Sequence, residues 1–183
     1  MSLPQKGLWL AGDIGGEHDV ETLQRGIAQP HGTRLVVGAG TGLGVCVLTW
    51  QDGAYAVHAS EGGHADFAPL DAQQDALLAS LRRNFGRVAY ERVVSGPGLL
   101  RIFSFLQDAG GGLPSRPLRD AMQKQDEAAA ISEFAVGHLD PLAVRALDLF
   151  IAIYGAFAGN MALTTLARGG VYIAGGIARQ IAG

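Results

Sequence analysis

Four glycine-rich stretches in a fixed order constrain the fold of this chain more than any other feature of its sequence. They are Gly38-Ala-Gly-Thr-Gly-Leu-Gly44, Glu61-Gly-Gly-His64, Ser95-Gly-Pro-Gly98 and Gly169-Gly-Val-Tyr-Ile-Ala-Gly-Gly176. Glycine beside a predicted strand marks a place where backbone must approach another backbone or a phosphate without an intervening Cβ. The function of the chain therefore depends on what each stretch can hold.

β-branched residues predict strands on both sides of the first stretch. Residues 33–37 end at glycine, residues 45–50 resume the pattern, and residues 54–59 follow the turn sequence Gln51-Asp-Gly53. These three strands form an antiparallel meander. A further short, buried strand over residues 171–174 ends at the pair Gly175-Gly176.

Helical patterns occupy the region between the meander and the last strand. Apolar spacing predicts helices over residues 73–85 and 98–109, and Asp140-Pro141 is an N-cap followed by proline that opens a helix to about residue 167. Residues 113–119, with Pro114 and Pro117, are predicted as a loop. Strands, then helices, then a final strand indicate an α/β fold in which helices cover a mixed sheet.

Charge and cysteine content exclude several classes of function. The net charge is −3 and no run of Lys or Arg occurs, so nucleic acid is not an expected partner. The single cysteine, Cys46, excludes an internal disulfide and a cysteine-rich zinc site, and no signal-peptide pattern opens the chain. The expected location is the cytoplasm.

Residues 149–167 carry no charge and contain the small-residue spacing Gly155 to Gly159, which also occurs in membrane helices. Asn160, Thr164 and Thr165 dilute the hydrophobicity, and no basic cluster flanks the segment. We therefore predict the buried helix of a protein that does not enter the membrane.

The stretch from Gly38 to Gly44 suits an anion although it matches neither common nucleotide motif. The Rossmann spacing would need glycine at Leu43, and no Lys-Ser/Thr follows as in a P-loop. Successive unobstructed backbone N–H groups can still cradle a phosphate, with the Thr41 hydroxyl as an extra donor. A plain hairpin turn is the alternative for this stretch. Gly175 and Gly176, after the last predicted strand, could present backbone to a nucleotide or could only permit close packing.

Glu61 and His64 are candidate sugar ligands, and Glu91 is a further candidate site residue, placed where a strand or loop enters a helix. A carboxylate accepts hydrogen bonds from adjacent hydroxyls, and an imidazole can donate or accept one. Glu61 and His64 alone fall short of a zinc set, so no protein metal site is predicted. A solvated loop is the alternative for Glu61 and His64, and a surface ion pair with Arg87 or Arg92 is the alternative for Glu91.

Taken together, four segments closely resemble the bacterial glucokinase family from about Val20 onward. They are Leu35-Val-Val-Gly-Ala-Gly-Thr-Gly-Leu-Gly44, Glu61-Gly-Gly-His-Ala-Asp-Phe67, Glu91-Arg-Val-Val-Ser-Gly-Pro-Gly98 and Gly169-Gly-Val-Tyr-Ile-Ala-Gly-Gly-Ile177. The resemblance implies a ribonuclease-H-like lobe of the actin-like ATPase fold, phosphorylation of glucose at O6 by ATP and Mg²⁺, and a homodimer.

The resemblance also implies roles for individual positions. Glu61, His64 and Glu91 correspond to the ligands of glucose. The nucleotide would be held by a phosphate loop containing Gly38, Gly40, Thr41, Gly42 and Gly44 and by an adenosine motif containing Gly175 and Gly176.

The sequence departs from the family pattern at both ends. Asp13-Ile-Gly-Gly16 imitates a first phosphate loop, but Glu17 replaces its threonine, and no Asn-Asp pair supplies the expected general base. We therefore expect residues 1–19 to be a leader or remnant and residues 20–183 to be a large lobe that is incomplete at its C-terminal end. No catalytic residue is identified, and impaired activity is expected. The alternative is a non-catalytic sugar-binding or assembly module.

Overall fold

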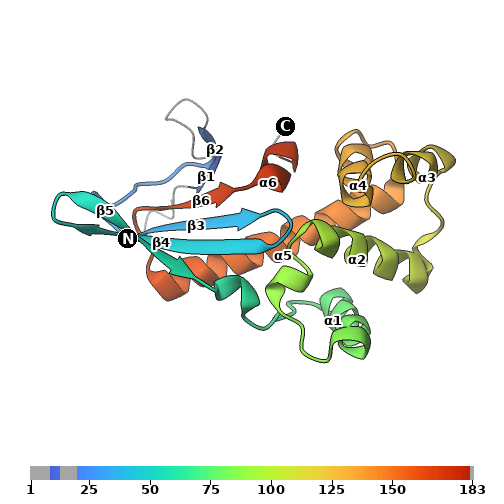
Figure 1. Cartoon of the computed structure of the whole chain (residues 1–183), viewed down its shortest axis with the longest axis horizontal. Coiled ribbons are helices and arrows are strands. Elements are labelled where there is room, and N and C mark those ends of the chain that lie inside the picture. The colour runs from blue at the N-terminus through green and yellow to red at the C-terminus, as the bar shows by residue number, and fades with distance from the viewer. Residues whose placement is uncertain (1–8, 13–19, 182–183) are drawn as a thin grey trace, which may run out of the picture.

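The computed structural model describes residues 9–12 and 20–181, in which one mixed sheet is combined with a group of helices (Figure 1). Most of the helices follow the β3–β4–β5 meander along the chain and precede the last strand. The strands are β1 (Trp9–Gly12), β2 (Val20–Gln24), β3 (Arg34–Ala39), β4 (Leu43–Gln51), β5 (Ala54–Ser60) and β6 (Gly170–Ala174). The helices are α1 (Ala72–Phe85), α2 (Gly96–Leu106), α3 (Arg116–Met122), α4 (Glu127–Val136), α5 (Pro141–Thr165) and α6 (Gly176–Ile181). Single turns are η1 (Gly62–His64) and η2 (Tyr90–Arg92), and η3 (Gln107–Gly111) is a wider turn that extends α2.

The described strands lie in the order β2-β1-β6-β3-β4-β5. β3, β4 and β5 pair antiparallel, whereas β6 runs parallel to both β1 and β3. This arrangement confirms the predicted meander and the mixed sheet. It also places the end of β3 beside the end of β6, so the first and last glycine-rich stretches lie at the same edge of the sheet.

Alternation along β3 determines which face of the sheet is buried. Leu35, Val37 and Ala39 have no exposed surface, while the residues between them are partly exposed. α5 packs against β3, α2 and α4, and Figure 1 shows it passing beneath the sheet and on into the group of helices. Phe150, Ile153 and Phe157 of α5 are fully buried. The core is therefore continuous from the sheet to the helices.

α5 begins as its sequence predicts. The Asp140 carboxylate accepts hydrogen bonds from the backbone N–H groups of Leu142 and Ala143, both at 2.9 Å, and Pro141 occupies the first turn. By length and composition α5 is the one described helix that could cross a membrane. However, 56% of its most hydrophobic stretch is buried within the protein. The structure thus supports the prediction of a core helix.

Two differences from the predicted elements have local causes. Residues 116–119, predicted as a loop, form the first part of α3. The Ser115 hydroxyl accepts from the N–H of Leu118, and Pro117 lies in the first turn, where a backbone N–H needs no helical partner. α4 was not predicted, because its alanine-rich sequence carries little amphipathic pattern.

The N-terminal strands also extend the sheet beyond the predicted elements. β1 lies within residues 1–19, the expected leader, and pairs with both β2 and β6. The division of the chain at residue 19 stays a prediction. The phosphate-loop-like residues 13–17 lie outside the described residues.

Candidate functional site

The tip of the β3–β4 hairpin consists of Gly40, Thr41 and Gly42. The N–H of Gly40 donates to the carbonyl of Gly42 at 2.9 Å, which closes the turn. The carbonyl of Gly40 accepts from the N–H of Gly96 at 2.8 Å. The hairpin tip is therefore tied to the first residue of α2, and the Thr41 side chain is exposed there.

The second glycine pair folds against the end of β3. Gly38 lies opposite Ala174 in the parallel pairing of β3 and β6. Gly175 has a φ of +97°, and a Cβ at this position would lie 2.4 Å from the Ala39 carbonyl oxygen. Only glycine accommodates both the left-handed backbone and this close approach. The sequence thus folds the second glycine pair directly onto the strand that leads into the hairpin.

The hairpin tip and the second glycine pair open into one cleft of about 620 Å³. Gly40, Thr41 and Gly176 line it, so the structure brings these three predicted nucleotide ligands together. Gly38, Gly42, Gly44 and Gly175 do not line this cleft. Gly38 and Gly175 instead lie where β3 and β6 end.

The remaining walls of the cleft come from helices. Gly96 and Pro97 begin α2, and Asp126, Glu127 and Ala128 surround the start of α4. A helix N-terminus carries the positive end of the helix dipole, which favours phosphate. In the first turn of α2, however, Gly96 N–H donates to Gly40, Pro97 has no N–H, and Gly98 N–H donates to Ser95. The Asp126 carboxylate is engaged as the N-cap of α4, since it accepts from Ala129 N–H at 2.9 Å. The cleft therefore combines the hairpin tip and two helix N-termini with the acidic side chains of Asp126 and Glu127.

Across the described residues, no group of three or more His, Cys, Asp or Glu side chains could hold a metal ion. Mg²⁺ commonly binds through substrate phosphates with only one or two carboxylates from the protein. Asp126 and Glu127 are the acidic residues that line the cleft. A nucleotide-bound Mg²⁺ is compatible with this donor set.

Glu61, His64 and Glu91 converge from two separate turns. His64 Nε2 lies 3.6 Å from Glu61 Oε2, and His64 Nδ1 lies 3.9 Å from Glu91 Oε1. Glu61 is 91% exposed, His64 55% and Glu91 35%. The three side chains thus form a row from the rim inward, with the imidazole between two carboxylates.

Glu91 also contacts the hairpin. Its Oε2 accepts from the N–H of Leu43 at 3.0 Å, and a Cβ on Gly42 would lie 2.6 Å from the same oxygen. In the described part of the chain, neither Arg87 nor Arg92 forms an ion pair with Glu91. Arg87 instead pairs with Asp66, and the Arg92 guanidinium lies over the Phe85 ring. The surface ion pair considered for Glu91 is therefore wrong.

Backbone packing fixes the turns that carry these side chains. A Cβ on Gly63 would lie 2.1 Å from the Leu43 carbonyl oxygen, so η1 packs directly on the first residue of β4, next to the hairpin tip. The buried Ser95 hydroxyl donates to the Glu91 carbonyl at 2.8 Å and accepts from Gly98 N–H at 3.1 Å. This hydroxyl joins η2 to the first turn of α2.

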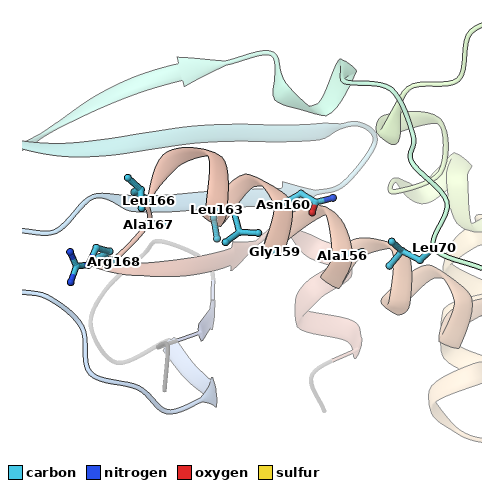
Figure 2. Close-up of a pocket in the computed structure, with 9 residues that line it drawn as sticks. Leu70, Ala156, Gly159, Asn160, Leu163, Leu166, Ala167 and Arg168 are labelled. Carbon is cyan, nitrogen blue, oxygen red and sulfur yellow. The ribbon is translucent and has the colours of Figure 1, made fainter. Parts of the chain in front are cut away.

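A second cavity of about 590 Å³ lies along the outer face of α5 (Figure 2). Leu163 near the end of α5 and Leu166 at its C-cap border it, together with Leu70 from the loop before α1. All three are more than two-thirds exposed. None of the predicted ligands lines this cavity, which separates it from the glycine-lined cleft.

Sequence reasoning missed the contribution of α4 and of Gln180 in α6 to the cleft. Asp126 followed by Glu127 and three alanines is a helix-start signal that could have located α4. Ser132, four residues after Ala128, lines the cleft as well. Its neighbours Ile131 and Glu133 form no motif that would indicate a ligand-facing position.

Solved structures with the same fold are glucokinases. A glucokinase from an Antarctic psychrotroph has a TM-score of 0.72 and 30% identity, covering 86% of this chain and 46% of that one. A glucokinase from Balamuthia mandrillaris, solved in complex with glucose, has a TM-score of 0.65 at 24% identity, covering 82% and 41%. The α/β fold described above is therefore the fold of these glucokinases, which confirms the predicted ribonuclease-H-like, actin-like ATPase class.

Sequence comparisons identify the family. The glucokinase family model matches residues 8–183. Glucokinases from Synechocystis sp. and Nostoc sp. are 42% and 44% identical to this chain over 180 and 178 residues, which is 91% and 90% of it. The chain belongs to the glucokinase family. It spans about half the length of these relatives, 51% and 52% respectively.

Proposed function

We propose that this chain is the glucose- and nucleotide-binding lobe of a glucokinase, which transfers a phosphoryl group from ATP to O6 of glucose. The observation that carries the proposal is the Glu91 carboxylate. It belongs to the predicted sugar ligands and accepts a hydrogen bond from the hairpin predicted to hold phosphate. Sugar and phosphate would thus be bound next to each other, on the two turns η1 and η2 and on the hairpin that Glu91 joins to η2.

In this proposal the row of Glu61, His64 and Glu91 binds the hydroxyls of glucose. The two carboxylates accept hydroxyl protons, and the imidazole orients the sugar between them. ATP would lie in the cleft, with its phosphates at Gly40 and Thr41 and its adenosine toward Gly175 and Gly176. Mg²⁺ would supply charge neutralisation on the phosphates.

Positioning and charge stabilisation are the contributions of these residues, because phosphoryl transfer needs little covalent chemistry from the protein. A general base must lie within hydrogen-bond reach of the sugar hydroxyl. The sequence contains no Asn-Asp pair to supply it. We therefore propose that the 183-residue chain binds both ligands and turns over weakly or not at all. Cytoplasmic location and a homodimer stay predictions of the sequence.

The experiment that tests the proposal combines turnover and binding. Glucose-dependent ADP production is measured on the purified chain, with Glu61→Gln as control, and glucose binding is measured by calorimetry and thermal unfolding. We expect glucose at a hundred times its Kd to add about 2.7 kcal/mol to the free energy of unfolding. A chain that neither binds nor responds to glucose would contradict the proposal and favour an assembly module. Turnover by the parent chain that disappears in Glu61→Gln would show that the chain has a general base that its sequence did not reveal.

A further inference from the structure

Tyr154 places a buried hydroxyl against the backbone that leads into the hairpin. Tyr154 lies on α5 and is 4% exposed. Its partners in β3 are 117 and 115 positions away in the sequence. Its hydroxyl donates to the Val37 carbonyl at 3.0 Å and accepts from the Ala39 N–H at 3.2 Å. A side chain of the core helix therefore holds the last two inward-facing residues of β3.

The environment of Tyr154 makes this contact well defined. Val37 and Ala39 are fully buried, and the Phe150 ring lies edge-on to the Tyr154 ring at 6.0 Å between centroids. Burial raises the pKa of Tyr154 well above its usual value, although the hydrogen bond from Ala39 lowers it in part. The hydroxyl therefore stays protonated and can donate throughout the physiological pH range.

The Ala39 residue is where the two glycine-rich segments meet. Its C-terminal neighbour is Gly40 at the hairpin tip, and its carbonyl oxygen lies against Gly175, where a Cβ would come within 2.4 Å. Movement of this residue would shift the hairpin tip and the second glycine pair relative to one another. Both segments border the same cleft through Gly40 and Gly176.

We propose that Tyr154 is a positioning residue for nucleotide binding: its hydroxyl fixes Ala39 and thereby the spacing between the hairpin tip and the Gly175-Gly176 turn. The proposal rests on the proposed function insofar as the cleft binds ATP. It assigns Tyr154 no contact with the nucleotide. The predicted sugar ligands lie on η1 and η2, outside the segment that Tyr154 holds, and among them only Glu91 is bonded to the hairpin, through Leu43 N–H, so the hydroxyl should affect glucose binding less than nucleotide binding.

Tyr154→Phe tests the proposal, because it removes the hydroxyl and keeps the ring. Tyr90→Phe is the matched control. Tyr90 is 3% exposed, and its hydroxyl has no hydrogen-bond partner among the described residues. Binding of a non-hydrolysable ATP analogue and of glucose is measured by calorimetry on both variants and on the parent chain.

We expect Tyr154→Phe to weaken binding of the ATP analogue about tenfold, since a buried N–H loses its partner. Glucose affinity should stay within about twofold, and Tyr90→Phe should change neither affinity by more than about twofold. Unchanged affinity for the analogue in Tyr154→Phe would overturn the proposal. An equal loss of both affinities would also overturn it, since that is the result of a merely structural role.

Amide hydrogen exchange of the ligand-free chain gives a readout that does not need nucleotide. Tyr154→Phe should raise exchange about tenfold at Ala39, Gly40 and Gly175, without a comparable change in α1. A uniform increase across the protein, or no increase at Ala39, would overturn the proposal. If the parent chain binds no ATP analogue, the proposed function fails, while the exchange pattern still decides whether Tyr154 fixes these segments.

Discussion

Solvent exposure differs strongly among the three predicted sugar ligands, and this difference gives them different roles. Glu61 is almost fully exposed and contacts only His64 among the described polar groups. Glu91 is mostly covered and is bonded to the hairpin backbone. A change at Glu61 therefore tests sugar binding with little disturbance to the fold, whereas a change at Glu91 also disturbs the hairpin.

Glu61→Gln should weaken glucose binding more than nucleotide binding. The amide keeps the size of the side chain but loses one of the two acceptor oxygens that suit adjacent hydroxyls, which corresponds to about 1–3 kcal/mol for a hydrogen bond to a charged group. Calorimetry with glucose and with an ATP analogue measures both affinities. Equal losses for the two ligands would sink the assignment of Glu61 to the sugar.

Thr41→Ala should show the opposite selectivity. Thr41 is exposed at the hairpin tip and lines the cleft, so its hydroxyl is available to a phosphate. We expect weaker binding of the ATP analogue by about 0.5–1.5 kcal/mol and unchanged glucose affinity. Unchanged affinity for the analogue would mean that Thr41 is only a turn residue.

Residue patterns predicted which side chains gather, but not how they are connected. Glu61, His64 and Glu91 were grouped from chemistry and family resemblance, and the structure brings them together. The bond from Leu43 N–H to Glu91 joins residues 48 positions apart. No local pattern encodes such a contact, since it depends on how η2 packs against the hairpin.

At the scale of elements, the N-cap of α5 links stability to pH. Asp140 is 1% exposed, and burial alone would raise its pKa. Hydrogen bonds from the N–H groups of Ser115, Ala143 and Leu142 outweigh burial and hold the pKa below its usual value. The ionised carboxylate therefore stabilises the fold above about pH 3.9, and this contribution is lost as the pH falls toward the lower pKa of the folded state.

Asp140→Asn should accordingly remove a pH-dependent part of the stability. The Asn amide has one acceptor oxygen where the carboxylate has two, so Ser115 N–H loses its partner. We expect the parent chain to be more stable than the variant by about 1–3 kcal/mol at pH 6, with the difference shrinking as the pH falls below 4. Urea unfolding of both proteins between pH 6 and pH 3 measures it. A difference that stays constant over this range would contradict the assignment of the titration to Asp140.

Two glycines in different elements should respond oppositely to alanine. At Gly63 a Cβ would meet the Leu43 carbonyl oxygen, so Gly63→Ala should destabilise the protein by about 1–3 kcal/mol. At Gly155, within α5, no atom lies within 4 Å of the added Cβ, so Gly155→Ala should stabilise it by about 0.5–1 kcal/mol. Chemical denaturation measures both values, and a destabilised Gly155→Ala would show that this face needs a small residue.

Elements with strong end signals were predicted well, and elements without them were not. Asp140-Pro141 located the start of α5, and Gly86 located the end of α1. α4 has an alanine-rich face, and Pro117 in α3 suggested a loop although proline suits a first helical turn. Propensity alone did not separate these cases, because tertiary packing decides them.

At the scale of the whole molecule, α5 joins the sheet to the helices through a single core. Tyr154 contacts β3, and Phe157 contacts the Tyr90 ring at 4.6 Å between centroids. The sequence predicted a long buried helix, but not that its two halves pack on different layers. Which layer each part of α5 contacts depends on the three-dimensional path of the chain, and the apolar pattern of the helix does not predict it.

We therefore expect the sheet and the helices to unfold in one transition. Trp50 near the end of β4 reports on the sheet by fluorescence in a Trp9→Phe background, and far-ultraviolet circular dichroism reports mainly on the helices. The two urea curves should coincide. Separate midpoints would mean that α5 does not couple the two parts, and Phe157→Ala, expected to cost about 3–5 kcal/mol, should shift both curves together.

The Glu91 carboxylate has one oxygen toward His64 and the other on the hairpin amide of Leu43. Under the proposed function, a sugar hydroxyl bonded to the first oxygen would change how strongly the second accepts from Leu43 N–H, so that sugar binding would alter the free energy of nucleotide binding. Such a linkage is reciprocal: whatever factor glucose imposes on the affinity for nucleotide, nucleotide must impose on the affinity for glucose. The Glu91 carboxylate would then couple the binding of the two ligands in both directions.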